Sequence, residues 1–128
     1  MTFFDRLAGW WRSHRPKQLG EQLAVAFDDD AVTVRVLADL DPEWNQTFRW
    51  ADVARVCFTD TGLYHSDLIR VQLHRQDKPV VVPLEAAGGP QFFGAICDRG
   101  LLPDEVWRRA IGDTRGGTHC WPPLEREA

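Results

Sequence analysis

The fold is decided by residues 42–62, which read PEWNQTFRWADVARVCFTDTG. Apolar side chains alternate with other residues at Phe48 and Trp50 and again over residues 56–58, which is the period of two shown by strands that cover a core on one face. Between these runs the spacing changes to three at Val53, as in a short helical turn or a bulge. We therefore expect two strands at the centre of a sheet, with a pivot between them.

A hairpin is predicted on each side of this stretch. Residues 23–36 alternate in hydrophobicity around three aspartates at 28–30, which are typical of a turn, and residues 68–82 alternate around a second polar turn. Pro79 and Pro83 cannot donate to a ladder, so the strand between them is expected at the edge of the sheet or at least poorly paired at both ends.

The remaining pattern predicts helices over residues 90–100 and 103–111, each closed by a glycine. The expected fold is α+β: a small bent antiparallel sheet or roll of about six to seven strands, closed by a C-terminal helix. We expect one β-rich domain over residues 18–112 and a flexible tail over residues 113–128, except where Trp121 docks.

Residues 1–17 predict an amphipathic N-terminal helix that ends before Pro16. Its apolar face must be buried somewhere, because a free helix of this length is marginal in water. The domain itself, a second copy in a homo-oligomer and a membrane surface are the three alternatives. The face consists of Phe3, Phe4, Leu7, Trp10 and Trp11.

Composition restricts the classes of function. A chain of 128 residues with a net charge of −4 fits one domain and argues against general nucleic-acid binding. Cys57, Cys97 and Cys120 show no pair or zinc-ligand spacing, so no disulfide framework, metal or cofactor is predicted and a reducing cytoplasm is favoured over secretion. No stretch approaches the roughly 18 apolar residues that span a bilayer. We expect a cytoplasmic protein, with the inner membrane surface as an alternative location.

The order of elements over residues 23–100 resembles the bacterial pleckstrin-homology-like (PH-like) families, which are small bent sheets plugged by one helix. The resemblance is carried by residues 48–56 (FRWADVARV), the hairpin over 68–82 and the helical residues 92–97. These families usually have seven strands and the pattern here gives six, so a seventh is expected within residues 37–47 if the resemblance holds. It implies binding of lipids, peptides or proteins rather than catalysis.

We therefore predict a noncatalytic protein-interaction module with an unknown protein partner. Trp44 lies in a polar loop after Pro42 and is the aromatic residue we expect to be exposed, with Glu43 and Asp39 as acidic neighbours that contact the partner. An acidic immunity or inhibitor protein, which covers a basic toxin or enzyme, is an alternative.

A second candidate surface is a basic hairpin formed by Arg70, His74, Arg75 and Lys78. It would suit an anionic ligand such as a phosphoinositide head group, which is the lipid-binding alternative, but aspartates flank it and favour a solvated hairpin.

A small enzyme using histidine and cysteine is the remaining alternative. Cys57 and Cys97 are expected at buried positions or flanks, and His119 with Cys120 supplies only two ligands in the tail. No catalytic activity is predicted.

Overall fold

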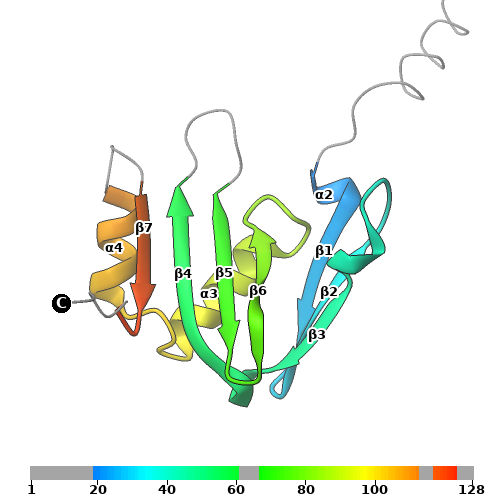
Figure 1. The fold of residues 1–128 in the computed structure, drawn as a ribbon. Helices are drawn as coiled ribbons and strands as arrows, with labels where there is room; N and C mark the ends of the chain where they lie inside the picture. The colour runs from blue at the N-terminus through cyan, green and yellow to red at the C-terminus, as the bar shows by residue number, and fades with distance from the viewer. Residues whose placement is uncertain (1–18, 61–66, 113–116, 124–128) are drawn as a thin grey trace, which may run out of the picture.

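Two antiparallel sheets form the body of the protein in a computed structural model that describes residues 19–60, 67–112 and 117–123 (Figure 1). The first sheet has the order β1-β2-β3, made of Leu23–Phe27, Ala31–Val36 and Gln46–Arg49. The second has the order β6-β5-β4-β7, made of Gln76–Pro83, Leu68–Leu73, Val53–Asp60 and Gly117–Trp121. The helices are α2 (Leu19–Gln22), α3 (Gly89–Asp98) and α4 (Asp104–Gly112), with 3-10 turns η1 (Pro42–Trp44) and η2 (Trp50–Asp52). The predicted α+β class with antiparallel sheets is confirmed.

The stretch that decides the fold contains the change from one sheet to the other. β3 ends at Arg49, η2 follows directly, and its last turn is closed by the N–H of Val53, which donates to the carbonyl of Trp50 before β4 runs on. The predicted pivot is confirmed. The placement of the stretch at the centre of one sheet is wrong, because β3 is an edge strand of the first sheet while β4 lies inside the second.

The alternation that predicts the strands also selects the core. β1, β2, β4, β5 and β6 bury apolar side chains at alternate positions, and β3 buries Phe48. α3 adds Phe92 and Ile96, which are both fully buried. α4 adds Val106 and Ala110. The strand residues in this core are Leu23, Val25, Val32, Val34, Phe48, Val56, Phe58, Ile69, Val71, Leu73, Val80 and Val82.

The segment before α3 covers the outer edge of β1. The N–H of Val25 donates to the carbonyl of Ala87 at 2.8 Å, and the N–H of Ala87 donates to the carbonyl of Leu23 at 2.9 Å. Gly88 follows with a φ of 80°, and a Cβ there would overlap the carbonyl oxygen of Val25. Only glycine combines a positive φ without strain with the absence of a Cβ. Gly88 therefore lets the chain turn from the segment beside β1 into α3.

Trp50 is the side chain on which the corner between the sheets is built. It is 8 % exposed, and its Nε1–H donates to the carbonyl of Asp28 at 2.8 Å. The Phe92 ring of α3 lies 5.9 Å from the indole, centroid to centroid, and the Arg99 guanidinium lies over the indole at 4.3 Å. The predicted inward position of Trp50 is confirmed.

The β1–β2 turn is tied to the same corner. The Asp28 carboxylate accepts hydrogen bonds from the N–H groups of Asp30 at 2.8 Å and Ala31 at 2.7 Å, which is the Asx-turn geometry that short acidic side chains favour. Arg99, which ends α3, donates to the carbonyl of Asp29 at 3.1 Å. One arginine therefore joins the helix, the turn and the indole.

The C-terminal part of the chain corrects two expectations. Residues 113–128 are predicted to be a flexible tail, but Gly117–Trp121 forms β7, antiparallel to β4. The seventh strand is therefore not within residues 37–47, where the structure has η1 and the start of β3. The local composition hides β7, because its stability comes from a partner strand that is distant in sequence.

The cysteines provide a third correction. Cys57 of β4 and Cys120 of β7 are directly paired across the ladder and form a disulfide. Their separation of 63 residues gives no sequence signature, since only the strand pairing brings them together. The argument for a reducing cytoplasm assumed unpaired cysteines, so this argument no longer holds.

We predict that Trp50→Ala lowers the free energy of unfolding by about 3–5 kcal/mol, because it removes a buried indole and leaves a cavity. Trp50→Phe keeps much of the apolar volume and loses the hydrogen bond to Asp28, so it should cost less. Denaturant melts of both variants measure the difference. A loss below about 1 kcal/mol for Trp50→Ala would contradict the corner described above.

We also predict that reducing the disulfide lowers the free energy of unfolding by about 4 kcal/mol, the chain-entropy value for a loop of this size. Cys57→Ser with Cys120→Ser should reproduce the loss and abolish the response to dithiothreitol. Cys97→Ser is the matched control, because Cys97 is a free thiol, and it should respond to dithiothreitol as the wild type does. A wild-type midpoint that reductant does not move would contradict the pairing.

Candidate functional site

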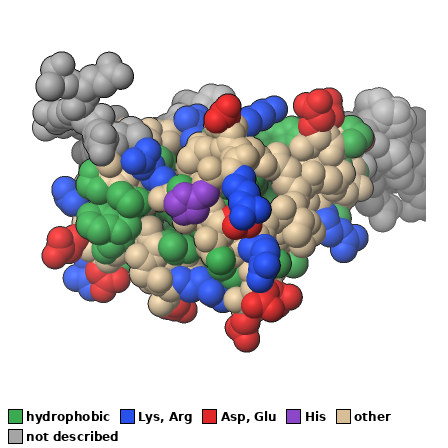
Figure 2. Space-filling view, turned by 60° about the horizontal axis from the view of Figure 1, so that its bottom comes forward, with side chains coloured by type: hydrophobic (Ala, Val, Ile, Leu, Met, Phe, Trp, Pro, Cys, Tyr) green, Lys and Arg blue, Asp and Glu red, His purple; other side chains and the backbone are tan. Residues whose placement is uncertain are grey.

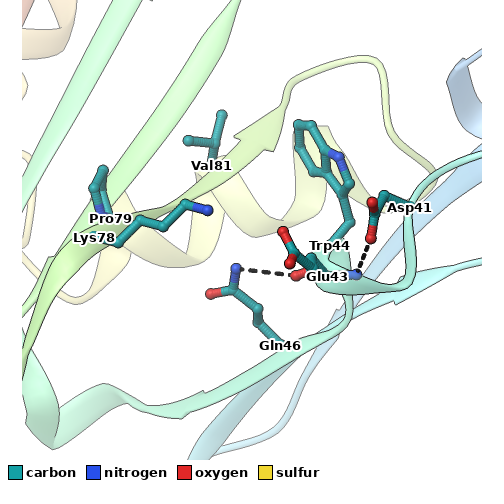
Figure 3. Close-up of a pocket in the computed structure, with 7 residues that line it drawn as sticks. All are labelled: Asp41, Glu43, Trp44, Gln46, Lys78, Pro79 and Val81. Atoms are coloured by element: carbon teal, nitrogen blue, oxygen red, sulfur yellow. Dashed lines mark hydrogen bonds between the residues drawn. The ribbon is translucent and has the colours of Figure 1, made fainter.

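A cleft of about 280 Å³ opens where β3 of the first sheet and β6 of the second sheet lie opposite each other (Figure 3). We call it the β3–β6 cleft. One wall comes from η1 with its flanking residue and the start of β3, and the other comes from β6. The lining residues are Asp41, Glu43, Trp44 and Gln46 on the first wall and Lys78, Pro79 and Val81 on the second.

The η1 wall is fixed by its caps. The Asp41 carboxylate accepts a hydrogen bond from the N–H of Glu43 at 2.8 Å, and Pro42 occupies the first position of the turn, where a missing N–H costs nothing. Asn45 ends the turn by donating from Nδ2 to the carbonyl of Pro42 at 3.1 Å, while its Oδ1 accepts from the N–H of Val36 at 2.8 Å. The turn is thereby attached to β2 and presents Glu43 and Trp44 in fixed positions.

The position of Trp44 differs from the prediction. The sequence predicts an exposed indole in a loop, but the side chain is half-buried and packs against the hydrophobic core. The reason is that η1 folds back along the sheet, so the ring points toward Val81 of β6 (Figure 3). A half-buried tryptophan at the mouth of a cleft offers part of its ring to a ligand and uses the rest for packing.

The β6 wall is an open strand edge. β6 is at the end of the second sheet, as the two prolines predict. The N–H of Leu84 donates to the carbonyl of Asp67 at 2.8 Å, so alternation places the N–H groups of Val80 and Val82 toward β5 and that of Val81 away from it. Pro79 and Pro83 share the outward register with Val81, where they interrupt no bond to β5.

β3 is also an open edge. The N–H of Trp50 donates to the carbonyl of Asp30 at 3.0 Å, and with the β2–β3 register this places Phe48 in a hydrogen-bonded pair. Thr47 and Arg49 therefore direct their main-chain N–H groups away from β2. No other strand of the described residues pairs with β3 on that side.

The charges that line the cleft form no ion pair with another described residue. Figure 3 shows the Lys78 side chain extending into the cleft opposite Glu43. Within the part of the chain that the structure describes, neither the Lys78 ammonium nor the Glu43 carboxylate has an ionic or hydrogen-bond partner. Both side chains are exposed and line the cleft, so a bound ligand would contact them.

The predicted partner-binding residues are brought together only in part. Trp44 and Glu43 line the cleft, whereas Asp39 is exposed in the preceding loop with a φ of 60° and is outside the lining. Gln46, Lys78 and the β6 residues were not predicted as part of this site. The prolines were the signal for an open edge, but the sequence does not show which wall would face that edge.

The residues of the predicted basic hairpin lie on three parts of the structure. Arg70 is exposed in the middle of β5, His74 and Arg75 form the β5–β6 turn, and Lys78 lines the cleft. On the face drawn in Figure 2, where this turn lies, Lys and Arg side chains around a histidine are interspersed with acidic side chains. The hairpin therefore lacks the continuous positive surface expected for an anionic ligand.

Two other hollows lie against α3. The hollow between α3 and α4 contains Cys97, where burial raises the pKa of the thiol and the carboxylates of Asp104 and Asp98 raise it further. A thiol of this kind is a weak nucleophile near neutral pH. Trp107 in the same hollow donates its indole N–H to Asp104 at 3.0 Å.

The other hollow lies beside the corner and includes Phe27, Asp28 and Arg99. Arg99 is already engaged with the indole of Trp50 and the β1–β2 turn. None of the three hollows is lined by a histidine. Among the described residues, no group of three or more His, Cys, Asp or Glu could hold a metal ion.

The predicted N-terminal face, Phe3, Phe4, Leu7, Trp10 and Trp11, lies outside the described residues. None of the described helices has the length and apolar character needed to cross a membrane.

Comparison with protein-family models, with curated proteins and with solved structures gives no match for this chain.

Asp28 provides a pH-dependent prediction. The hydrogen bonds from the N–H groups of Ala31 and Asp30 lower the pKa of its carboxyl below the ordinary 3.8. Its ionised form therefore stabilises the fold above that value, and the contribution is lost as the pH falls through the lower pKa of the folded state. We expect Asp28→Asn to melt below the wild type at pH 7 and the gap to narrow as the pH falls below 3.8.

The control for this experiment is Asp77→Asn in the exposed part of β6, which should melt close to the wild type throughout. A gap for Asp28→Asn that stays constant from pH 7 to about pH 2 would contradict the role of the Asp28 carboxylate.

Proposed function

We propose that the protein is a noncatalytic protein-interaction module and that its partner binds at the β3–β6 cleft. The observation that carries the proposal is the half-buried Trp44 in a cleft between two open strand edges. Tryptophan in a partly desolvated site is the side chain most often found at the energetic centre of protein interfaces. Glu43 and Lys78 beside it, which have no ionic partner among the described residues, supply charges that would fix the orientation of the partner.

We also infer that the fold belongs with the PH-like rolls. The supporting observations are the change of sheet at η2 and the position of α3, which follows the last hairpin and inserts Phe92 and Ile96 into the core. The departure is that the seventh strand follows the helices and joins the outer side of β4. In such folds the function resides in individual surface sites, so the proposal rests on the cleft rather than on the fold.

An anionic lipid ligand is not proposed. The basic residues predicted for it are distributed over a strand, a turn and a cleft wall, and the segment 28–60 carries eight Asp/Glu against three Arg. This acidic character favours a protein partner with basic residues.

The test is affinity capture with the full chain, comparing Trp44→Ala, Glu43→Gln and a matched Trp107→Ala. Trp107 is also a half-buried tryptophan, but it lies on α4 outside the cleft. We expect the wild type and Trp107→Ala to retain a saturable partner and the two cleft variants to lose at least about tenfold in affinity, as for a hot-spot residue.

Denaturant melts accompany this test, so that loss of binding is read only where the variant is folded at the assay temperature. Equal binding by Trp44→Ala and the wild type, equal loss with Trp107→Ala, or the absence of a saturable partner would contradict the proposed function.

A further inference from the structure

The β3 edge presents the main chain of a free strand beside the cleft. Thr47 and Arg49 point their N–H groups away from β2, because Gln46 and Phe48 occupy the hydrogen-bonded positions of the ladder. These free groups stand two residues apart, which is the spacing at which an added strand makes its hydrogen bonds. An open edge of this kind is a template for another chain.

We propose that the β3–β6 cleft binds an extended segment of the partner protein, which pairs its main chain with the β3 edge and places basic side chains against Glu43 and Trp44. This inference rests on the proposed function and specifies the chemical class of the bound segment. Main-chain bonds would supply affinity in this mode, and the side chains at alternate positions would supply specificity.

The edges of β6 and β1 are less suited to an added strand. Between Pro79 and Pro83, β6 has Val81 as the single residue that can donate an outward N–H. The outer edge of β1 is already bonded to Ala87. Prolines and covered edges are means by which proteins prevent strand addition, so among the described strands the β3 edge is the one left open along this cleft.

The charge of the cleft indicates what the segment carries. Asp41, Glu43 and the Trp44 ring form one wall, with Lys78 as the single cation among the lining residues. An arginine or lysine of the segment would pair with the Glu43 carboxylate and lie on the indole, where a cation is attracted to the ring face. A second copy of this chain would bring the same acidic segment to itself, so a different, basic partner fits better.

Thr47 allows the main-chain bond to be tested apart from the side chain. Thr47→Pro removes the outward N–H, and the native ladder does not use this group because residue 47 occupies a non-hydrogen-bonded pair with Thr33. The preceding residue is already in a strand, which is the conformation a following proline requires. Thr47→Val is the matched control, since both variants lose the hydroxyl contact to Thr33 and only one loses the amide.

The probes are fluorescein-labelled (Thr-Arg)5 and (Thr-Glu)5 peptides, with binding to the full chain measured by fluorescence polarisation. We expect (Thr-Arg)5 to bind at least about tenfold more tightly than (Thr-Glu)5. Thr47→Pro, Trp44→Ala and Glu43→Gln should each weaken (Thr-Arg)5 by about tenfold, while Thr47→Val stays within about twofold.

Alternate N-methylation of the probe supplies the second readout. In a strand added to one edge, only every second amide faces that edge. Methylating either all Thr or all Arg amides should therefore abolish binding in one peptide and leave the other peptide bound. Equal effects of the two methylation patterns, Thr47→Pro binding as well as Thr47→Val, or no binding of (Thr-Arg)5 would each overturn the inference.

The two proposals fail in different ways. If capture of the partner depends on Trp44 and Glu43 but Thr47→Pro and Thr47→Val behave alike, the proposed function stands and strand addition is wrong. The protein could instead form a dimer that Thr47→Pro dissociates and Thr47→Val does not. That result would show that the cleft binds a second copy of the chain, and it would overturn the choice of a basic partner.

Discussion

The packing of the Trp50 indole against α3 and the β1–β2 turn is the interaction on which the two-sheet arrangement depends. Its N–H bonds to the carbonyl of Asp28, and its ring contacts Phe92 and lies under Arg99. Three segments distant in sequence therefore meet at one side chain, located where β3 ends and η2 begins. Because the chain changes sheets here, β3 and β6 remain edge strands instead of becoming neighbours in one ladder.

The cleft follows from that division. Its two walls belong to different sheets, and each sheet has its other end strand beside another segment: Ala87 is bonded to the outer edge of β1, and α4 lies beside β7 (Figure 1). Prolines protect the edge of β6, while the outward N–H groups of Thr47 and Arg49 leave the edge of β3 open beside the cleft. An unprotected strand edge is an aggregation hazard. A binding role would explain why the β3 edge stays unprotected beside Trp44.

The sequence predicts what local periodicity controls. Alternation at Phe48 and Trp50 and again over residues 56–58 gives two strands, the change of spacing at Val53 gives the pivot, and the prolines place β6 at an edge. It does not predict contacts that depend on distant partners: β7 is stabilised by pairing with β4, and the Cys57–Cys120 bond exists only because that pairing exists. Trp44 shows the same limit, since its polar neighbours predict exposure but the wall it packs on comes from a hairpin over thirty residues later.

Hydrogen exchange of the individual edge amides, measured by NMR on the free protein, tests the central claim most directly, namely that β3 and β6 are open edges on two separate sheets. The account predicts fast exchange at Thr47 and Val81 and strong protection at Phe48, Val80 and Val82, whose N–H groups lie in the ladders. Protection of Thr47 and Val81 equal to that of these neighbours would mean that β3 and β6 pair with each other, and the cleft would not exist.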